Sequence, residues 1–332
     1  RGPRPGLTAG ERRATPAFCR AAAISSSQID HSGQACLTTG MATPTPPAWL
    51  DRAAWPFVPR GVDTGEGVQH YVDEGQGPTV LLVHGTPTWS FEWRHVIAGL
   101  RARHRVVAVD HLGFGLSHRP SGAGYRPEDH ARRFRRFVDM VCPAEPLTLV
   151  AHDFGGPIAL DWALDHPDRL ARLVITNTWM WPLDDDAGMR RGARLIASPI
   201  GRWMYRRLNA SQKLVMPSAY ADKRRLTPAI HAQYLNVFPD ADSRERVLFA
   251  LAQSLLGSSA FYRALWDRRD RLRGVATHIL WGLKDSAFQP YILERWKTTL
   301  PEAGVVTFDD AGHWPHEEAP EAYVRALAAI TG

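Results

Sequence analysis

Six short runs of apolar, mostly β-branched residues recur between residues 79 and 310 and point to one class of fold. They lie at residues 79–85, 105–111, 147–153, 172–177, 277–282 and 304–310. Continuous apolar runs of this length are typical of strands covered on both faces, as in a parallel sheet. Segments with helical spacing, such as residues 157–166 and 320–330, lie between or after them. This alternation predicts an α/β fold with a mostly parallel sheet flanked by helices.

A long gap interrupts the alternation. Between Asn177 and Thr277 about a hundred residues pass without a convincing strand, and they carry Trp, Tyr, Arg and Leu at helical spacing. An insertion of this size after a single strand predicts a helical cap over the sheet. The expected organisation is an α/β core from residues 41–177 and 277–332, with the cap at residues 178–276.

The first forty residues differ from the rest, because they are rich in Arg, Ala, Ser and Gly and show no periodicity. We expect residues 1–40 to be disordered or a non-native extension, since Met41 opens a plausible natural start. The alternative is a transit peptide, which is also rich in Arg and Ser and poor in acids.

Composition excludes several classes of partner. The net charge is +6, much of it in the first forty residues, and no basic stripe follows. A nucleic-acid partner is therefore not expected. No apolar stretch is long enough to cross a membrane. Of three cysteines only Cys142 lies in the part expected to fold, so a disulfide framework is not expected and a reducing, cytoplasmic location is favoured.

The segment AHDFGGP, residues 151–157, follows an apolar run and predicts a strand, a sharp turn and the start of a helix. A small residue, any residue, the nucleophile, any residue and a small residue form the nucleophile elbow of α/β-hydrolases. Asp153 stands where the nucleophile belongs. Asp285 and His313 each follow a later predicted strand, so the chain order is nucleophile, acid, histidine, as in that fold. Helix capping for the two aspartates and a loop role for the histidine are the alternative interpretations.

An oxyanion site is expected beside Asp153. In this fold two backbone N–H groups hold the developing oxyanion. One belongs to the residue after the nucleophile, Phe154, and the other to the loop after the His84–Gly85 pair, at Thr86. An ordinary strand-to-helix turn would also explain this loop.

A carboxylate nucleophile selects a particular chemistry. Attack on an acyl carbon would give an anhydride, so its natural target is a saturated carbon that bears a leaving group or belongs to a strained ring. Displacement leaves an alkyl ester on Asp153. His313 then activates water, and Asp285 stabilises the imidazolium that forms. This scheme needs no metal and no organic cofactor, only a small apolar substrate and water.

These residues resemble a known family. The segments HGTPTWSFEWR, DHLGFGLSHRP, AHDFGGPIALDWA, NTWMWP, GLKDSAF and DDAGHWPHEEAP are similar to haloalkane dehalogenases of the α/β-hydrolase superfamily. The resemblance covers about residues 48–330. It implies that Asp153 is the nucleophile, His313 the base and Asp285 the acid, as in the subfamilies that place the acid late. The earlier acid position holds Asn177, which cannot serve as one.

Two positions depart from the family. Its members usually have Trp after the nucleophile, whose indole N–H binds the leaving halide, whereas Phe154 has no donor. They also tend to have Asn or Glu where Thr86 stands. The cap region offers three candidates for a substitute donor, Trp179, Trp181 and Trp203, and simple packing beneath the cap is the alternative interpretation of each.

Three different functions compete with haloalkane cleavage. An epoxide hydrolase shares the nucleophile and base and opens its ring with help from cap tyrosines, for which Tyr205, Tyr220, Tyr234 and Tyr262 are available. Fluoroacetate dehalogenases carry Arg after the nucleophile, so Phe154 favours an uncharged substrate instead. A degenerate, receptor-like module that only binds ligands is the possibility outside catalysis.

Overall fold

The structure is a computed structural model that describes Gly2 and residues 45–143, 146–184 and 186–332. The expectation for residues 1–40 falls outside this described part, apart from Gly2. Contacts group Gly40–Gly332 into one unit, and the sheet, helices and sites below all belong to it.

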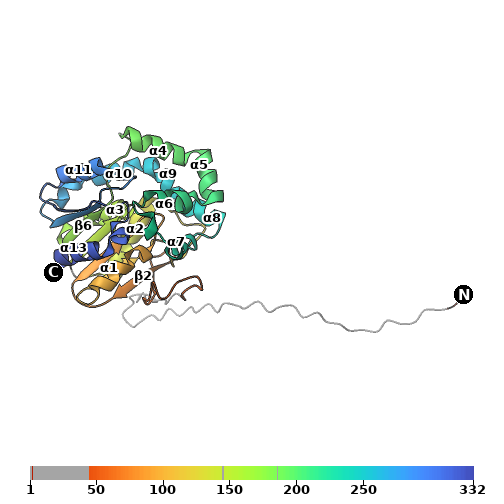
Figure 1. Cartoon of the computed structure of the whole chain (residues 1–332), viewed down its shortest axis with the longest axis horizontal. Coiled ribbons are helices and arrows are strands. Elements are labelled where there is room, and N and C mark those ends of the chain that lie inside the picture. The colour runs from red at the N-terminus through yellow and green to blue at the C-terminus, as the bar shows by residue number, and fades with distance from the viewer. Residues whose placement is uncertain (1, 3–44, 144–145, 185) are drawn as a thin grey trace, which may run out of the picture. The chain divides into compact units, whose positions relative to one another are not determined.

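An eight-stranded sheet forms the centre of this unit (Figure 1). Its strands are β1 (Arg60–Asp63), β2 (Val68–Glu74), β3 (Thr79–Val83), β4 (Arg105–Val109), β5 (Leu147–His152), β6 (Leu170–Thr176), β7 (Thr277–Gly282) and β8 (Gly304–Phe308). They lie in the order β1-β2-β4-β3-β5-β6-β7-β8. Strands β3 to β8 pair in parallel, and β2 runs antiparallel to both of its neighbours. The fold class predicted from the sequence is confirmed, with all six predicted strands present.

The first two strands were not predicted. β2 contains buried Gln69 and His70, which do not read as an apolar strand. His70 Nδ1 lies 2.6 Å from Asp110 Oδ2, and the Gln69 side-chain amide donates to the Asp110 carbonyl oxygen at 3.2 Å. Because the Gln69 amide and one ring nitrogen of His70 have partners on the neighbouring strand's end, these residues can be buried without appearing in the hydrophobic pattern.

Helices cover the sheet. Those of the core are η1 (Ser90–Trp93), α1 (Arg94–Leu100), α2 (Pro127–Val141), α3 (Gly155–Ala163), η2 (Pro167–Arg169), α11 (Pro290–Thr299), α12 (Pro315–Glu318) and α13 (Pro320–Thr331). α1 packs against α13, and α2 packs against α3. Every residue of β3 and β5 is buried, as expected of strands covered on both faces. The edge strand β8 differs most, because its first four residues are exposed, so its apolar run was wrongly expected to be covered on both faces.

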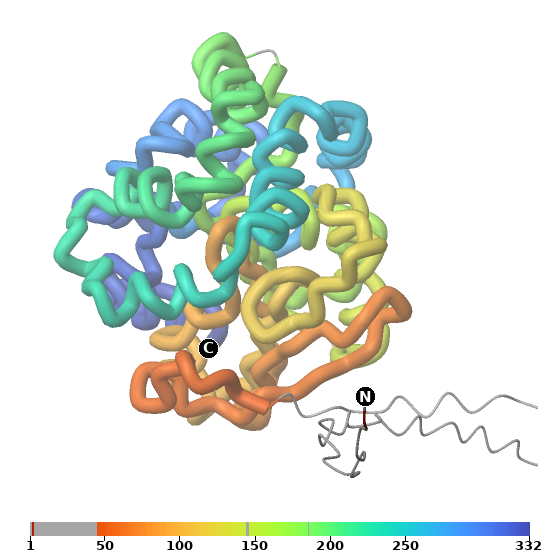
Figure 2. Tube along the Cα trace, turned by 90° about the vertical axis from the view of Figure 1, so that its right-hand side faces the viewer, coloured from red at the N-terminus to blue at the C-terminus, as the bar shows by residue number. Residues whose placement is uncertain are grey.

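In its described residues, the segment between β6 and β7 consists of helices joined by loops and contains no strand. Its helices are α4 (Ala187–Ala197), α5 (Pro199–Trp203), η3 (Met204–Leu208), η4 (Ser211–Val215), α6 (Met216–Ala219), η5 (Lys223–Arg225), α7 (Pro228–Leu235), α8 (Ala241–Ser243), η6 (Arg244–Phe249), α9 (Ala250–Gly257), α10 (Ser259–Asp267) and η7 (Arg269–Leu272). We call residues 178–276 the cap segment. Figures 1 and 2 show α4 and α5 at the opposite end of the unit from β2. None of the described helices is long and apolar enough to cross a membrane.

Candidate active site

The predicted elbow is present at the end of β5. Asp153 follows the strand directly and has a φ of 50°, in the left-handed region that a residue with a side chain rarely occupies. α3 begins two residues later, at Gly155. A Cβ at Gly155 would lie 2.5 Å from the carbonyl oxygen of Val83, and one at Gly156 would lie 1.8 Å from Thr178 Oγ1. The turn therefore requires glycine after Asp153 because neighbouring groups approach too closely for any side chain.

The carboxylate of Asp153 is held in a fixed orientation. The backbone N–H of Thr86 donates to Asp153 Oδ1 at 2.7 Å. A Cβ at Gly85 would lie only 2.3 Å from the same oxygen, so glycine there allows the loop after β3 to approach the carboxylate. Asp153 is 6% exposed. One carboxylate oxygen is thus bound by the amide predicted for the oxyanion site.

The other oxygen faces the predicted base. His313 Nε2 lies 3.6 Å from Asp153 Oδ2, and His313 Nδ1 lies 2.7 Å from Asp285 Oδ2. Asp285 Oδ1 accepts from the backbone N–H groups of Ala287 and Phe288, at 2.7 and 3.0 Å. Loops after three different strands therefore bring Asp153, His313 and Asp285 into one chain of contacts, and all three are buried.

Neighbouring buried charges shift the pKa values of Asp285 and His313. Burial alone would raise the pKa of Asp285, but the adjacent His313, with its hydrogen bond, and the donors from Phe288 and Asn177 bring it below its ordinary value. Burial alone would lower the pKa of His313, whereas Asp285 and Asp153 together raise it to about 10. An ester on Asp153 removes one of these two carboxylate charges, so alkylation lowers the pKa of His313.

Asn177 forms hydrogen bonds at this site that the sequence did not predict. Its Nδ2 donates to Asp285 Oδ2 at 2.8 Å, and its Oδ1 accepts from the backbone N–H of Gly282 at 2.9 Å. The residue has a φ of 33°, and its carbonyl oxygen accepts from the backbone N–H of Asp153. It was considered only as an acid. Its place at the end of β6, between β5 and β7, was the signal that it would touch both catalytic loops.

A cavity of about 750 Å³ opens above Asp153. Its wall combines core residues with apolar side chains of the cap segment, which include Ile196, Val215, Leu248 and Leu255. Among the described residues that line it, none is Lys or Arg. A cavity of this size and character suits a sizeable, uncharged, apolar ligand.

The three tryptophans proposed as halide donors lie elsewhere, since none of them lines this cavity in the described part of the chain. Trp179 packs behind Phe154, with ring centres 4.9 Å apart. Trp181 packs against Trp296, and Trp203 is 54% exposed on the cap surface. Helical spacing identified aromatic residues of the cap region but could not show which face the cavity.

A different tryptophan does line the cavity. Trp314, directly after His313, is buried with its ring 4.6 Å from the imidazole centre. Within the described residues neither its indole nitrogen nor the hydroxyl of Thr86, which also lines the cavity, has a hydrogen-bond partner. Among the described residues, both donor atoms are buried and unpaired, and their residues adjoin Asp153 in space and His313 in sequence.

The four tyrosines considered for ring opening are separated by the fold. Only Tyr205 lines the cavity. Burial, with the charge of Asp153, raises the pKa of Tyr205 to about 12, against a hydrogen bond to Ser211 that lowers it. Tyr220 and Tyr234 instead contact Glu317, and Tyr262 donates to the carbonyl oxygen of Ser254.

Comparisons with known proteins show the family of this chain. A family model for the alpha/beta hydrolase fold matches residues 78–320. The chain belongs to this family. It is 39% identical over 281 residues to haloalkane dehalogenase 2 of Mycobacterium tuberculosis, across 84% of this chain and 96% of the relative. Within the α/β-hydrolases it is therefore a haloalkane dehalogenase-like hydrolase.

One further relative and one solved structure are also similar to this chain. A cis-3-alkyl-4-alkyloxetan-2-one decarboxylase of Xanthomonas campestris is 33% identical over 300 residues, across 82% of this chain and 96% of the relative. The crystal structure of haloalkane dehalogenase DbeA from Bradyrhizobium elkanii superposes with a TM-score of 0.73 at 25% identity, across 81% of this chain and 96% of that one. Relatives of this hydrolase thus act on more than one kind of substrate.

Proposed function

We propose that the chain cleaves the carbon–halogen bond of apolar haloalkanes through an alkyl ester on Asp153. The observation that carries this proposal is the pair of contacts of one carboxylate. Asp153 Oδ1 is bound by the Thr86 N–H, and Oδ2 faces His313 Nε2 across 3.6 Å. A carboxylate held in this way has one oxygen free to attack saturated carbon and the other already in an oxyanion site.

The first step is displacement. Asp153 Oδ2 attacks the carbon that bears the halogen, the carbon–halogen bond breaks, and the halide leaves with the bonding pair. No side chain of Lys or Arg lines the described cavity, which favours a neutral substrate over a haloacid. The Thr86 hydroxyl and the Trp314 indole N–H are the donors we assign to the departing halide.

The second step is hydrolysis of the ester. His313 takes a proton from a water molecule, which attacks the carboxyl carbon of Asp153, and Asp285 stabilises the resulting imidazolium. The oxygen that becomes negative is Oδ1, already bonded to the Thr86 N–H at 2.7 Å. Collapse releases an alcohol and restores the aspartate.

The size of the cavity sets the expected chain length. At about 750 Å³ it exceeds what a two-carbon substrate fills. Burial of apolar surface contributes about 0.8 kcal/mol for each CH₂ group. We therefore expect medium or long 1-haloalkanes to be turned over with higher kcat/KM than 1,2-dibromoethane.

A second candidate is opening of a strained four-membered lactone, and the donor set favours it. Phe154 offers no halide donor, and a relative acts on a 3,4-dialkyl oxetan-2-one. Asp153 would attack the saturated ring carbon next to the ring oxygen. The bond between that carbon and the ring oxygen would break, and the carboxylate so released would stay on the substrate. Loss of CO₂ from that carboxylate would form the alkene and expel Asp153, so no halide and no water take part.

Epoxide hydrolysis and ligand binding without catalysis have less support. Epoxide opening by a pair of cap tyrosines has only Tyr205 at the cavity, since Tyr220, Tyr234 and Tyr262 are bonded elsewhere. A module that only binds ligands does not account for the chain of contacts from Asp153 through His313 to Asp285.

The deciding experiment compares wild type and His313→Phe on 1-bromohexane and on a cis-3,4-dialkyl oxetan-2-one. We expect the wild type to release bromide continuously. His313→Phe should stop after one equivalent, with the alkyl mass on Asp153. A lactone decarboxylase would give alkene and CO₂ in both proteins, because His313 has no step there. Absence of both bromide and an alkyl adduct would overturn the proposal.

A further inference from the structure

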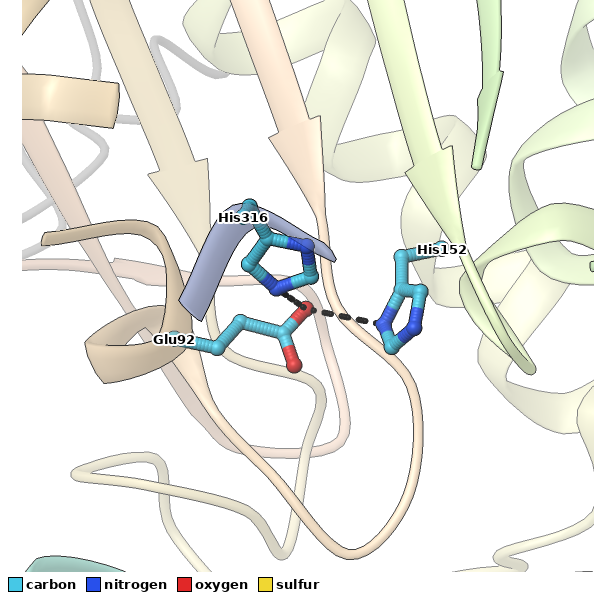
Figure 3. A group of neighbouring side chains, drawn as sticks. All are labelled: Glu92, His152 and His316. Carbon is cyan, nitrogen blue, oxygen red and sulfur yellow. Dashed lines mark ion pairs between the residues drawn. The ribbon is translucent and has the colours of Figure 1, made fainter. Parts of the chain in front are cut away.

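A second group of buried polar side chains lies behind the catalytic residues. It consists of Glu92 on η1, His152 at the end of β5 and His316 on α12, and we call it the Glu–His–His cluster (Figure 3). All three residues have 0% exposure. His152 precedes the nucleophile directly in sequence. The proposed reaction uses none of these three side chains.

The three side chains converge on one point. His152 Nδ1 lies 3.3 Å from Glu92 Oε1, and His316 Nε2 lies 3.8 Å from the same oxygen. One nitrogen from each histidine and one carboxylate oxygen all lie within 4.8 Å of one another. Figure 3 shows both rings beside the carboxylate, each with one nitrogen directed toward the same oxygen.

Hydrogen bonding does not account for this arrangement. Counting partners among the described residues, both oxygens of Glu92, Nδ1 of His152 and both ring nitrogens of His316 have none. A buried carboxylate without a donor is costly, and in folded proteins such a group is almost always satisfied. Within the described residues these donor atoms are therefore uncommitted, although they lie close to one another.

The tautomer of His152 leaves one ring nitrogen free to bind a metal ion. Its Nε2 lies 2.9 Å from the backbone carbonyl oxygen of His313, which can only accept, so Nε2 carries a proton. In the neutral ring this leaves a lone pair on Nδ1, aimed at Glu92. A metal-binding histidine is held in this way, because its second nitrogen donates to a carbonyl or carboxylate and fixes the ring.

We propose that the Glu–His–His cluster binds a divalent transition-metal ion, with Zn²⁺ the best match. Two imidazole nitrogens and a carboxylate form a common zinc ligand set. Ligands about 2.1 Å from a tetrahedral zinc lie about 3.4 Å apart, close to the 3.3 Å between His152 and Glu92. His316 must approach by about half an ångström. The second oxygen of Glu92 can supply a fourth donor.

The role of this site is structural. Catalytic metal sites keep an open coordination position for substrate or water, whereas every member of this cluster is fully buried and its donors face one another. The ion would enter during folding. It would join the segment after β3, the residue before Asp153 and the helix that follows His313, and so fix both catalytic loops relative to each other.

Metal content of the whole chain tests the proposal. Protein produced in zinc-supplemented medium should carry about one zinc per chain by inductively coupled plasma mass spectrometry. Unfolding in denaturant with a chelator and refolding without metal should lower Tm, and refolding with Zn²⁺ should restore it. Refolding with Co²⁺ should give the visible absorption bands of a tetrahedral nitrogen and oxygen site.

Three variants locate the ion. Glu92→Gln and His316→Gln should each lose the zinc and the cobalt bands, whereas the matched control His278→Gln, at a histidine on β7 outside the cluster, should keep both. If Glu92→Gln does not fold, His316→Gln and the metal-free wild type decide. Wild type that binds no equimolar zinc or cobalt, or cluster variants that retain the metal, would overturn the proposal, and a proton shared within the cluster would then replace the ion.

Discussion

Asn177 Nδ2 donates to Asp285 Oδ2 at 2.8 Å, and that same oxygen accepts from His313 Nδ1 at 2.7 Å. The amide therefore fixes the rotation of the carboxylate that orients the imidazole. It does so from β6, whose end lies beside the elbow on one side and beside β7 on the other. In the proposed reaction Asn177 would act through Asp285 and would touch no reacting atom, so we assign it a positioning role.

Replacing Asn177 by Gly removes this donor and keeps the left-handed backbone, since glycine adopts a φ of 33° without strain. A hydrogen bond to a charged group contributes about 1.5–3 kcal/mol, so we expect steady-state turnover of 1-bromohexane to fall about 10- to 100-fold. The burst of bromide in the first turnover should persist, because His313 acts only on the ester. Loss of the burst together with turnover would indicate a merely structural defect.

Isotope transfer checks the ester directly. In a single turnover in H₂¹⁸O with enzyme in excess, the alcohol should contain unlabelled oxygen from Asp153, and the peptide that contains Asp153 should gain one ¹⁸O. This follows because water attacks the carboxyl carbon and not the alkyl carbon. Mass spectrometry of both products measures it, and labelled alcohol from the first turnover would mean that water displaces the halide directly.

Asp153→Ala, which has no nucleophile, should lose more than about 10³-fold in kcat.

The elbow and the grouping of Asp153, Asp285 and His313 could be predicted from the sequence for a physical reason. The elbow must hold small residues around Asp153, and the ends of parallel strands meet at one edge, so residues far apart in sequence could be placed together. The sequence did not show which side chains of the cap segment point into the cavity. Trp203 and Tyr205 are two residues apart, yet one is exposed and the other lines the cavity. Residues two positions apart lie on different sides of a helix, so helical spacing separates these two side chains but does not show which of them faces the cavity.

The Glu–His–His cluster escaped the sequence analysis for a related reason. Glu92, His152 and His316 are separated by sixty and more than a hundred and sixty residues, so no local spacing of metal ligands joins them. A lone buried histidine is most simply interpreted as a satisfied core residue. Among the described residues, the convergence of three ligand atoms, together with their missing hydrogen bonds, distinguishes this group.

Gly85→Ala tests how tightly the loop after β3 must approach the nucleophile. The new Cβ would lie 2.3 Å from Asp153 Oδ1 and 2.4 Å from its Cβ, and the elbow backbone cannot yield easily. We expect displacement of the carboxylate to lower kcat/KM at least 100-fold and overpacking to cost about 1–3 kcal/mol of unfolding free energy. Gly257→Ala, where nothing lies within 4 Å of the new Cβ, is the control and should leave kcat/KM unchanged without lowering the unfolding free energy. Unaltered kinetics in Gly85→Ala would show that the contact relaxes.

Phe154→Trp tests whether the leaving group is a halide. Phe154 forms part of the cavity wall beside Asp153, and its ring meets Trp179 edge-on. An indole N–H at this place adds one hydrogen bond to an anion, so bromide should bind about 10- to 100-fold more tightly, measured by quenching of tryptophan fluorescence. Release of bromide from 1-bromohexane should become faster in the first turnover. Phe154→Leu, which also lacks a donor, is the matched control and should bind bromide as weakly as wild type. If a folded Phe154→Trp protein shows no gain in bromide affinity, the leaving group departs on another side of Asp153, and lactone opening becomes the better account of the cavity.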